Sequence, residues 1–233
     1  METQDIIALI LVYMIIAASL GASMYCRRRQ YAVDYRKIVH VGVGFFVFVW
    51  WAFTENWIML VFFAIPFAIV LFIAMFDGNK VSDSELGDLS NKMGHRTGLF
   101  LYVVSIIILV AFFFDGHWTA ATIGVVAMTF GDAAGSAVGR RCGRHHVLPK
   151  KSVEGTLAVF AATALMAGVI LIYYGWLASN GWYDGSVDAS IPGWACCVIA
   201  GAITAVSEMV CPGEVDNLAN PLLTAVAMAL LGL

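Results

Sequence analysis

The chain has 233 residues, of which 61% are hydrophobic and 12% are charged, with a net charge of −3. Soluble globular domains contain about 25% charged residues, so this composition excludes an ordinary soluble domain. We expect an all-α integral membrane protein, with no nucleic-acid partner and an oligomeric state that the sequence does not define.

Apolar runs divide the chain into candidate transmembrane helices. Measured against the roughly 20 residues that cross a bilayer, they predict a bundle of about eight helices in a single membrane domain, residues 1–233. The spans lie near residues 6–26, 37–53, 56–76, 98–114, 117–139, 153–177, 191–209 and 216–233. The second, fourth and last are short, which leaves open seven spans or half-inserted segments.

The basic residues predict the orientation of this bundle. All 13 Lys and Arg residues lie in the loops after the first, third and fifth spans. In an eight-span arrangement these loops share one side, which the positive-inside rule makes cytoplasmic, and both termini lie on the opposite side. All seven tryptophans fall at helix ends or in a loop on that opposite side, as interfacial aromatic residues do.

The first polar cluster is the segment RKIVHVGVG at residues 36–44, where the second span begins. Arg36 and His40 are four residues apart and Lys37 is three before His40, so the three share a helix face. They either anchor the helix at the membrane surface or contact nucleotide phosphates, and we favour the phosphates. Further along, Pro66 predicts a kink in the third span.

The next cytoplasmic loop, residues 77–97, mixes acidic and basic residues. It is either a solvated connector or a lid over an active site. In the second case His95 and Arg96 would contribute to that site.

The stretch GDAAGSAVGRRCGRHHVLPKKSVEGT, residues 131–156, concentrates charge between two apolar helices. Asp132, Ser136 and Arg140 form one helical stripe, and Gly131, Gly135 and Gly139 form another. The glycines either pack helices closely or admit a ligand. Five cations follow Asp132 in this stretch: Arg140, Arg141, Arg144, Lys150 and Lys151.

The start of the sixth span adds a site for an anion. Ser152 is a candidate N-cap with Glu154 in the first turn, and a helix N-terminus beside Lys150 and Lys151 attracts negative charge. Since GxxxxGK[ST] occurs nowhere, a Walker A nucleotide site is excluded.

A third polar cluster, residues 208–221, contains Glu208, Asp216 and Asn217. The predicted topology brings the loops 27–40, 77–97, 132–156 and 208–221 to the cytoplasmic end of the bundle. Carboxylates with amide oxygens can hold Mg²⁺, and Lys and Arg side chains neutralise phosphate charge. The pattern therefore predicts phosphate chemistry at a membrane surface.

These motifs resemble the CTP-dependent lipid-alcohol kinases, which include dolichol and polyprenol kinases, phytol and farnesol kinases and the fungal-type diacylglycerol kinase. The resemblance lies in residues 36–44, 131–144, 150–160 and 208–222, about a quarter of the chain. It implies transfer of the γ-phosphate of CTP to the primary hydroxyl of a membrane lipid, with a divalent metal such as Mg²⁺. Relatives often carry paired acidic residues where this chain has Val215 and Asp216.

The hypothesis that follows assigns a role to each cluster. Asp132, Glu208 and Asp216 would hold the metal or orient the alcohol, helped by Asn217. The expected contacts to the nucleotide are Arg36, Lys37, His40, Gly135, Gly139, Arg140, Arg141, Lys150, Lys151 and Ser152, and Glu154 would orient Lys151 or act as base. We favour an isoprenoid alcohol of the dolichol, phytol or geranylgeraniol type. A diacylglycerol kinase, a CDP-lipid synthase and an ion-coupled transporter are the alternatives.

Overall fold

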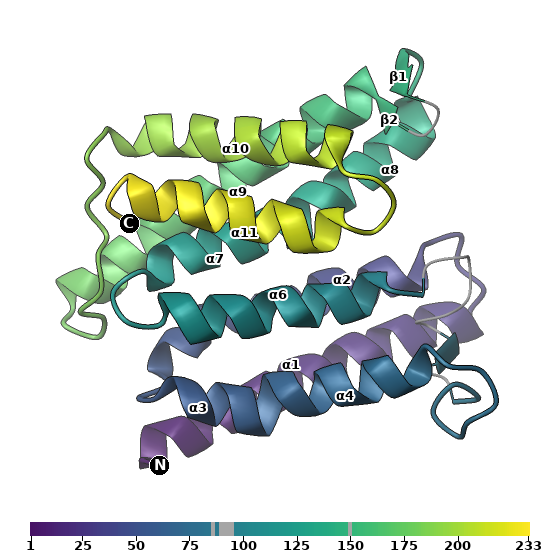
Figure 1. Ribbon diagram of the computed structural model, residues 1–233, viewed down its shortest axis with the longest axis horizontal. Helices are drawn as coiled ribbons and strands as arrows, with labels where there is room; N and C mark the ends of the chain where they lie inside the picture. Colours follow the sequence, from purple (N-terminus) through teal and green to yellow (C-terminus); the bar gives the residue numbers. More distant parts are fainter. Residues whose placement is uncertain (85–86, 89–95, 149–150) are drawn as a thin grey trace. The chain divides into compact units, whose positions relative to one another are not determined.

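The computed structural model describes residues 1–84, 87–88, 96–148 and 151–233 (Figure 1). His95 and Lys150, both expected at the site, lie outside these ranges. The chain divides into two compact units, Met1–Ala111 and Phe112–Leu233, and each is described by itself.

The described residues fold into helical segments that follow the eight predicted spans. Four belong mainly to the first unit: α1 (Thr3–Arg28), α2 (Tyr35–Gly44), α3 (Asn56–Met59) continuing into α4 (Ile65–Ala74), and α6 (Gly98–Phe113). The second unit holds α7 (Trp118–Val126) continuing into α8 (Asp132–Cys142), α9 (Val153–Ser179), α10 (Gly193–Val210) and α11 (Asp216–Leu230). A short hairpin, β1 (His146–Leu148) and β2 (Lys151–Ser152), precedes α9.

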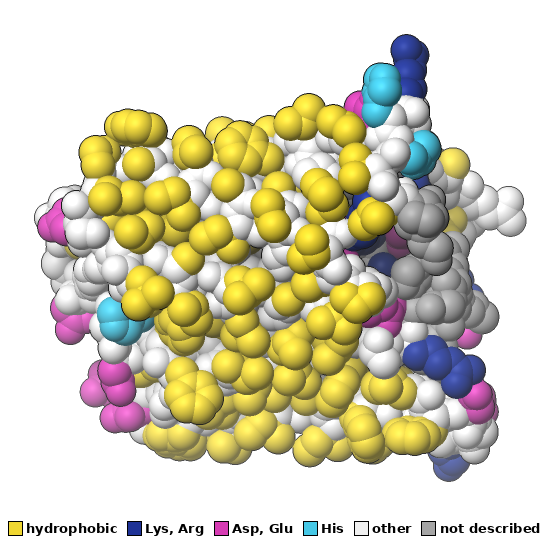
Figure 2. Space-filling model, turned by 45° about the horizontal axis from the view of Figure 1, so that its top comes forward, with side chains coloured by type: hydrophobic (Ala, Val, Ile, Leu, Met, Phe, Trp, Pro, Cys, Tyr) yellow, Lys and Arg dark blue, Asp and Glu magenta, His cyan; other side chains and the backbone are white. Residues whose placement is uncertain are grey.

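Length and apolar composition support the predicted membrane protein. Five of the described helices can cross a bilayer: Thr3–Arg28, Asn56–Ala74, Trp118–Cys142, Val153–Ser179 and Gly193–Val210. The three spans predicted to be short are short here too, as α2, α6 and α11 contain 10, 16 and 15 residues. Apolar side chains cover the helix sides on the face drawn in Figure 2. The all-α membrane fold is thus confirmed.

In the first unit, the second predicted span is not one regular helix. After α2 the backbone tightens into two 3₁₀ turns, Phe45–Phe48 and Trp50–Ala52. The buried rings of Phe46 and Trp50 pack edge to face, with 5.1 Å between ring centroids. Near the expected kink, a π-helical turn at Leu60–Ala64 precedes Pro66, which cannot donate the helical hydrogen bond.

In the second unit, close helix packing depends on glycine. A Cβ at Gly124 of α7 would strike the carbonyl oxygen of Pro221 in α11, so only glycine lets these two backbones meet. Gly135 of α8 faces Val159 of α9 in the same way. As a result, α8 and the start of α9 lie directly against each other, and the polar stretch between them is held at one end of the unit.

Candidate active site

Lys151 on β2 is the centre of the candidate site. Its Nζ atom lies 2.5 Å from Oε1 of Glu208 at the end of α10, and 3.6 Å from Oδ2 of Asp216 at the start of α11. The side chain of Lys151 is 26% exposed and those of both carboxylates are 11% exposed. Two clusters that are distant in the sequence therefore meet at one lysine.

The charges around Lys151 keep it protonated. Burial lowers its pKa, but the carboxylate of Glu208 and its hydrogen bond, together with Asp216 and Asp132, outweigh burial. The pKa of Lys151 is consequently raised above its ordinary value. At neutral pH the Lys151 side chain is therefore an ammonium group held in place by its neighbours. Ammonium groups of this kind bind phosphate oxygens.

Amide side chains on α11 hold the two carboxylates that contact Lys151. Nδ2 of Asn220, which is fully buried, donates to Oε2 of Glu208 at 2.8 Å, and Nδ2 of Asn217 donates to Oδ1 of Asp216 at 3.1 Å. Each carboxylate thus uses one oxygen toward an amide and the other toward Lys151. Asn220 follows Asp216 by one helical turn, a spacing that could have marked it in the sequence.

Asp132 approaches the same group of charges from α8. It follows a π-helical turn at Ala127–Gly131, inside the long helix formed by α7 and α8. Such turns insert an extra residue and change the direction of the side chains after them, often at functional sites. The buried Asp132 carboxylate accepts a hydrogen bond of 3.3 Å from Ser136 Oγ.

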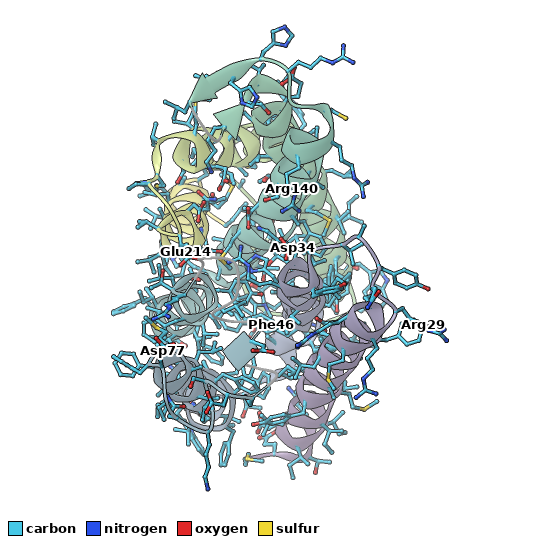
Figure 3. The ribbon with its side chains drawn as sticks, turned by 90° about the vertical axis from the view of Figure 1, so that its right-hand side faces the viewer. Arg29, Asp34, Phe46, Asp77, Arg140 and Glu214 are labelled. Atoms are coloured by element: carbon cyan, nitrogen blue, oxygen red, sulfur yellow. The ribbon has the colours of Figure 1, made fainter. Side chains whose placement is uncertain are left out.

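A pocket of about 500 Å³ opens beside Lys151. Glu208 and Lys151 form part of its wall, with Ser136, Arg140, His146, Ser152, Thr156 and Val159. Four glycines also line it: Gly135, Gly139, Gly143 and Gly155. Figure 3 looks at this end of the second unit, with Arg140 on α8 and Glu214 in the turn before α11. Of the predicted glycine stripe, Gly135 and Gly139 lie against α9 and also line this pocket, and their contact with a nucleotide stays a prediction.

The connection from α8 to α9 is pinned by Ser152 and Glu154. Ser152 caps α9 as predicted, since its side chain accepts from the backbone N–H of Gly155 at 3.2 Å. Glu154 accepts from the backbone N–H groups of Arg144 and His145 and lies 2.7 Å from Nδ1 of His145. The structure therefore places Glu154 against the loop, where sequence reasoning expected it beside Lys151.

The other predicted residues lie at different distances from this centre. Arg141 is exposed at the end of α8, next to the Arg140 that lines the pocket. Arg36, Lys37 and His40 belong to α2 of the first unit, so their expected contact with the nucleotide stays a prediction. Gly143, Gly155 and His146 were not predicted as site residues, although all fall inside the stretch 131–156.

The carboxylates do not by themselves form a metal centre. Across the described ranges, no group of three or more His, Cys, Asp or Glu side chains has the arrangement of a metal site. Magnesium sites in nucleotide enzymes use one or two carboxylates plus substrate phosphates and water. Asp132 and Asp216, whose charges both act on Lys151, suit that kind of site.

Comparison with known proteins gives two related sequences. A phytol kinase of Synechocystis sp. is 34% identical over 145 residues, 59% of this chain and 58% of the relative. The chain is therefore similar in sequence to a phytol kinase. A probable chloroplastic phytol kinase of Triticum aestivum is 31% identical over 153 residues, 61% of this chain and 50% of that protein.

These matches support the resemblance to lipid-alcohol kinases that the motifs suggested, and they extend over more than half of the chain. The matched region is little more than half the length of these phytol kinases. No family model matches the chain, and no solved structure matches it.

Proposed function

We propose that this chain is a kinase that transfers the γ-phosphate of CTP to the primary hydroxyl of a membrane isoprenoid alcohol of the phytol, geranylgeraniol or polyprenol type. The observation that carries the proposal is Lys151, an ammonium group fixed by Glu208 and Asp216 on the wall of a glycine-lined pocket. Similarity to phytol kinases favours an alcohol as the acceptor.

The reaction would proceed as an in-line displacement. The alcohol oxygen attacks the γ-phosphorus, the bond from that phosphorus to the β–γ bridging oxygen breaks, and CDP leaves. The hydroxyl proton passes to a carboxylate, for which we assign Asp132. Lys151 and Arg140, with Arg141 and Lys150, would balance the charge that spreads over the phosphate oxygens.

The glycine residues in the pocket wall would leave room for the phosphate groups of CTP. With no side chains at Gly139 and Gly143, phosphate oxygens can approach the helix end and the loop closely. The N-terminus of α9, capped by Ser152, adds the positive end of a helix dipole.

The proposal includes Mg²⁺, which Asp216 would hold together with the nucleotide phosphates, with Glu208 and Asn217 supporting it, while Asp132 serves as the proton acceptor. When bound, the ion would neutralise part of the triphosphate charge. We also propose that the site faces the cytoplasm, with both termini on the opposite side.

A labelled-nucleotide assay tests the function. Purified protein in detergent receives Mg²⁺, γ-labelled CTP or ATP, and in turn phytol, geranylgeraniol, dolichol or diacylglycerol. Label in an isoprenoid monophosphate, with CTP preferred, is the expected result. In a parallel reaction with added phosphatidic acid, release of the label as pyrophosphate while the CMP group joins that lipid would indicate a CDP-lipid synthase instead and overturn the proposal.

A variant of Asp132 tests the assigned proton acceptor. Loss of a general base reduces turnover by about 10²–10⁴-fold, so Asp132→Asn should lower kcat by that factor. Asp184→Asn, an exposed carboxylate in the loop before α10, is the matched control. If both variants keep the parental kcat while phosphorylating the alcohol, Asp132 has no part in proton transfer.

A further inference from the structure

The second half of α1 presents two arginines on an exposed side of the helix. Tyr25, Arg28 and Arg29 are exposed and lie at positions i, i+3 and i+4, so they share one face. Arg27, which precedes them, instead forms an ion pair of 2.8 Å with Asp88. Figure 3 shows the labelled Arg29 pointing outward from the end of α1. Two positive charges therefore lie on the surface where a helix long enough to span a membrane ends.

Two tyrosines flank these arginines. The centroid of the Tyr25 ring lies 5.5 Å from the guanidinium carbon of Arg29 and 6.4 Å from the centroid of the Tyr31 ring. The chain reverses at Gln30, whose φ of 52° lies in the left-handed region that residues other than glycine rarely adopt. The hydroxyl of Tyr35 donates to the Tyr31 carbonyl at 2.9 Å and holds this turn. Tyr25 and Tyr31 remain 54% and 51% exposed, as tyrosines at a membrane–water interface do.

Small side chains occupy the same face of α1 on the bilayer side of Tyr25. Ala18, Gly21 and Ala22 precede Tyr25 by seven, four and three residues, and all are exposed. Among the described residues, no atom lies within 4 Å of the position that a Cβ at Gly21 would take. This part of α1 therefore leaves the helix backbone open to close approach by a hydrocarbon chain or another helix.

A lipid with a charged phosphate matches both parts of this face. We propose that the face binds an anionic phospholipid of the bilayer, with the phosphate at Arg28 and Arg29 and an acyl chain along the small residues before Tyr25. Arginine binds phosphate oxygens through two parallel hydrogen bonds, and basic residues where a transmembrane helix ends attract anionic lipids. The inference concerns the first unit alone and is independent of the proposed kinase function.

A second copy of the chain is the alternative occupant, since small residues also let transmembrane helices pack together. A parallel copy on this face would place its own Arg28 and Arg29 against those of the first, however, and like charges repel. An anionic phosphate neutralises the same two charges. Charge complementarity therefore favours the lipid.

Lipid titration measures the preference for negative charge. The full chain, freed of lipid in detergent, receives phosphatidylglycerol or phosphatidylcholine with the same acyl chains, and native mass spectrometry gives the affinity for each. One arginine near the membrane surface contributes about fivefold, so Arg28→Gln and Arg29→Gln should each lower the preference for phosphatidylglycerol by that factor. Lys80→Gln, at an exposed loop lysine of the first unit, is the matched control and should keep the parental preference. A preference that is unchanged in both arginine variants would refute the proposal.

Photolabelling tests the location of the lipid. Phosphatidylglycerol with a diazirine in its acyl chain is photolysed with the full chain in nanodiscs, and the modified residues are mapped. Labels should fall on residues 17–25 of α1 and decrease in Gly21→Leu, whose new Cβ meets none of the described residues. Ile10→Phe, in the first half of α1 at a side chain that is 53% exposed, is the control and should leave the labelling unchanged. Labelling that is equal in the parent and in Gly21→Leu would contradict an acyl chain on this face.

Two other results would assign the face to a different partner and overturn the proposal. Glycerol phosphate carries a charged phosphate without acyl chains, so its displacement of phosphatidylglycerol at equal concentration would indicate a site for free phosphate. A dimer in the native mass spectra that Gly21→Leu removes, and that phosphatidylglycerol leaves intact, would indicate an interface between two copies.

Discussion

The contact between Lys151 and Glu208 can be measured by a double-mutant cycle on stability. The variants are Lys151→Met, Glu208→Gln and the two combined, which keep the side-chain lengths close to those of the parent. A hydrogen bond between charged groups contributes about 1.5–3 kcal/mol. Because a quarter of the Lys151 side chain is exposed to screening solvent, we expect a coupling of about 1–2 kcal/mol.

The measurement is unfolding of each protein in mixed detergent micelles, followed by tryptophan fluorescence. Glu208→Gln removes the nearer ion pair of Lys151 and leaves the one with Asp216 at 3.6 Å, and Lys151→Met leaves two carboxylates without their shared cation. The double variant should therefore be more stable than the sum of the single losses predicts. Additive losses, within about 0.5 kcal/mol, would mean that the two side chains do not interact.

Two further predictions concern the residues around the pocket. Gly135→Ala should destabilise the protein by about 1–3 kcal/mol in the same unfolding assay, because its Cβ would strike Val159. In Gly139→Ala the new Cβ would make only ordinary contacts, 3.5 Å from Ser152 Oγ and 3.7 Å from Gly155 Cα. The free energy of unfolding should therefore stay at the parental value while KM for the nucleotide rises. Equal loss of stability in Gly135→Ala and Gly139→Ala would contradict this packing. Glu154→Gln should speed amide hydrogen exchange at Arg144 and His145, because the backbone N–H groups of these residues donate to the Glu154 carboxylate. It should also raise KM for the nucleotide more than it lowers kcat. Unchanged exchange would show that Glu154 does not hold the loop in place.

Sequence patterns with a local physical cause anticipate much of this structure. Runs of apolar residues mark the helices, and the three spans predicted to be short are the short ones in the structure. The N-cap at Ser152 was predictable because a serine precedes an apolar helix with an acid in its first turn. The stretch 131–156 was identified by charge density within an apolar chain.

Contacts between residues that are far apart in the sequence could not be predicted from these patterns. Lys151 and Glu208 are 57 residues apart, and the predicted topology placed them only at the same end of the bundle. Glu154 was expected to orient Lys151 or to act as base; in the structure the Lys151 side chain lies against Glu208 of α10, whereas Glu154 contacts Arg144 and His145 of the loop. Neighbours in a sequence can point in opposite directions where a strand meets a helix.

Two features of the backbone also escaped sequence reasoning. A π-helical turn adds one residue without changing hydropathy, so the turn before Asp132 left no signal. The division into two compact units was not predicted either, since apolar helices of the same kind continue across the boundary at Ala111 and Phe112. The contact between the rings of His40 and Tyr102 was not predicted either, and the expected contact of His40 with phosphate stays a prediction.

The most direct test of the account is transfer of labelled γ-phosphate from CTP to geranylgeraniol by the parent protein, Lys151→Met and Lys80→Met. Lys80 is a loop lysine of the first unit and serves as the control for lost positive charge. Removal of one charge-stabilising donor costs about 10²–10³-fold in kcat, so Lys151→Met should lose that much while Lys80→Met keeps parental transfer. Parental transfer by Lys151→Met would contradict the assignment of this pocket as the phosphate site.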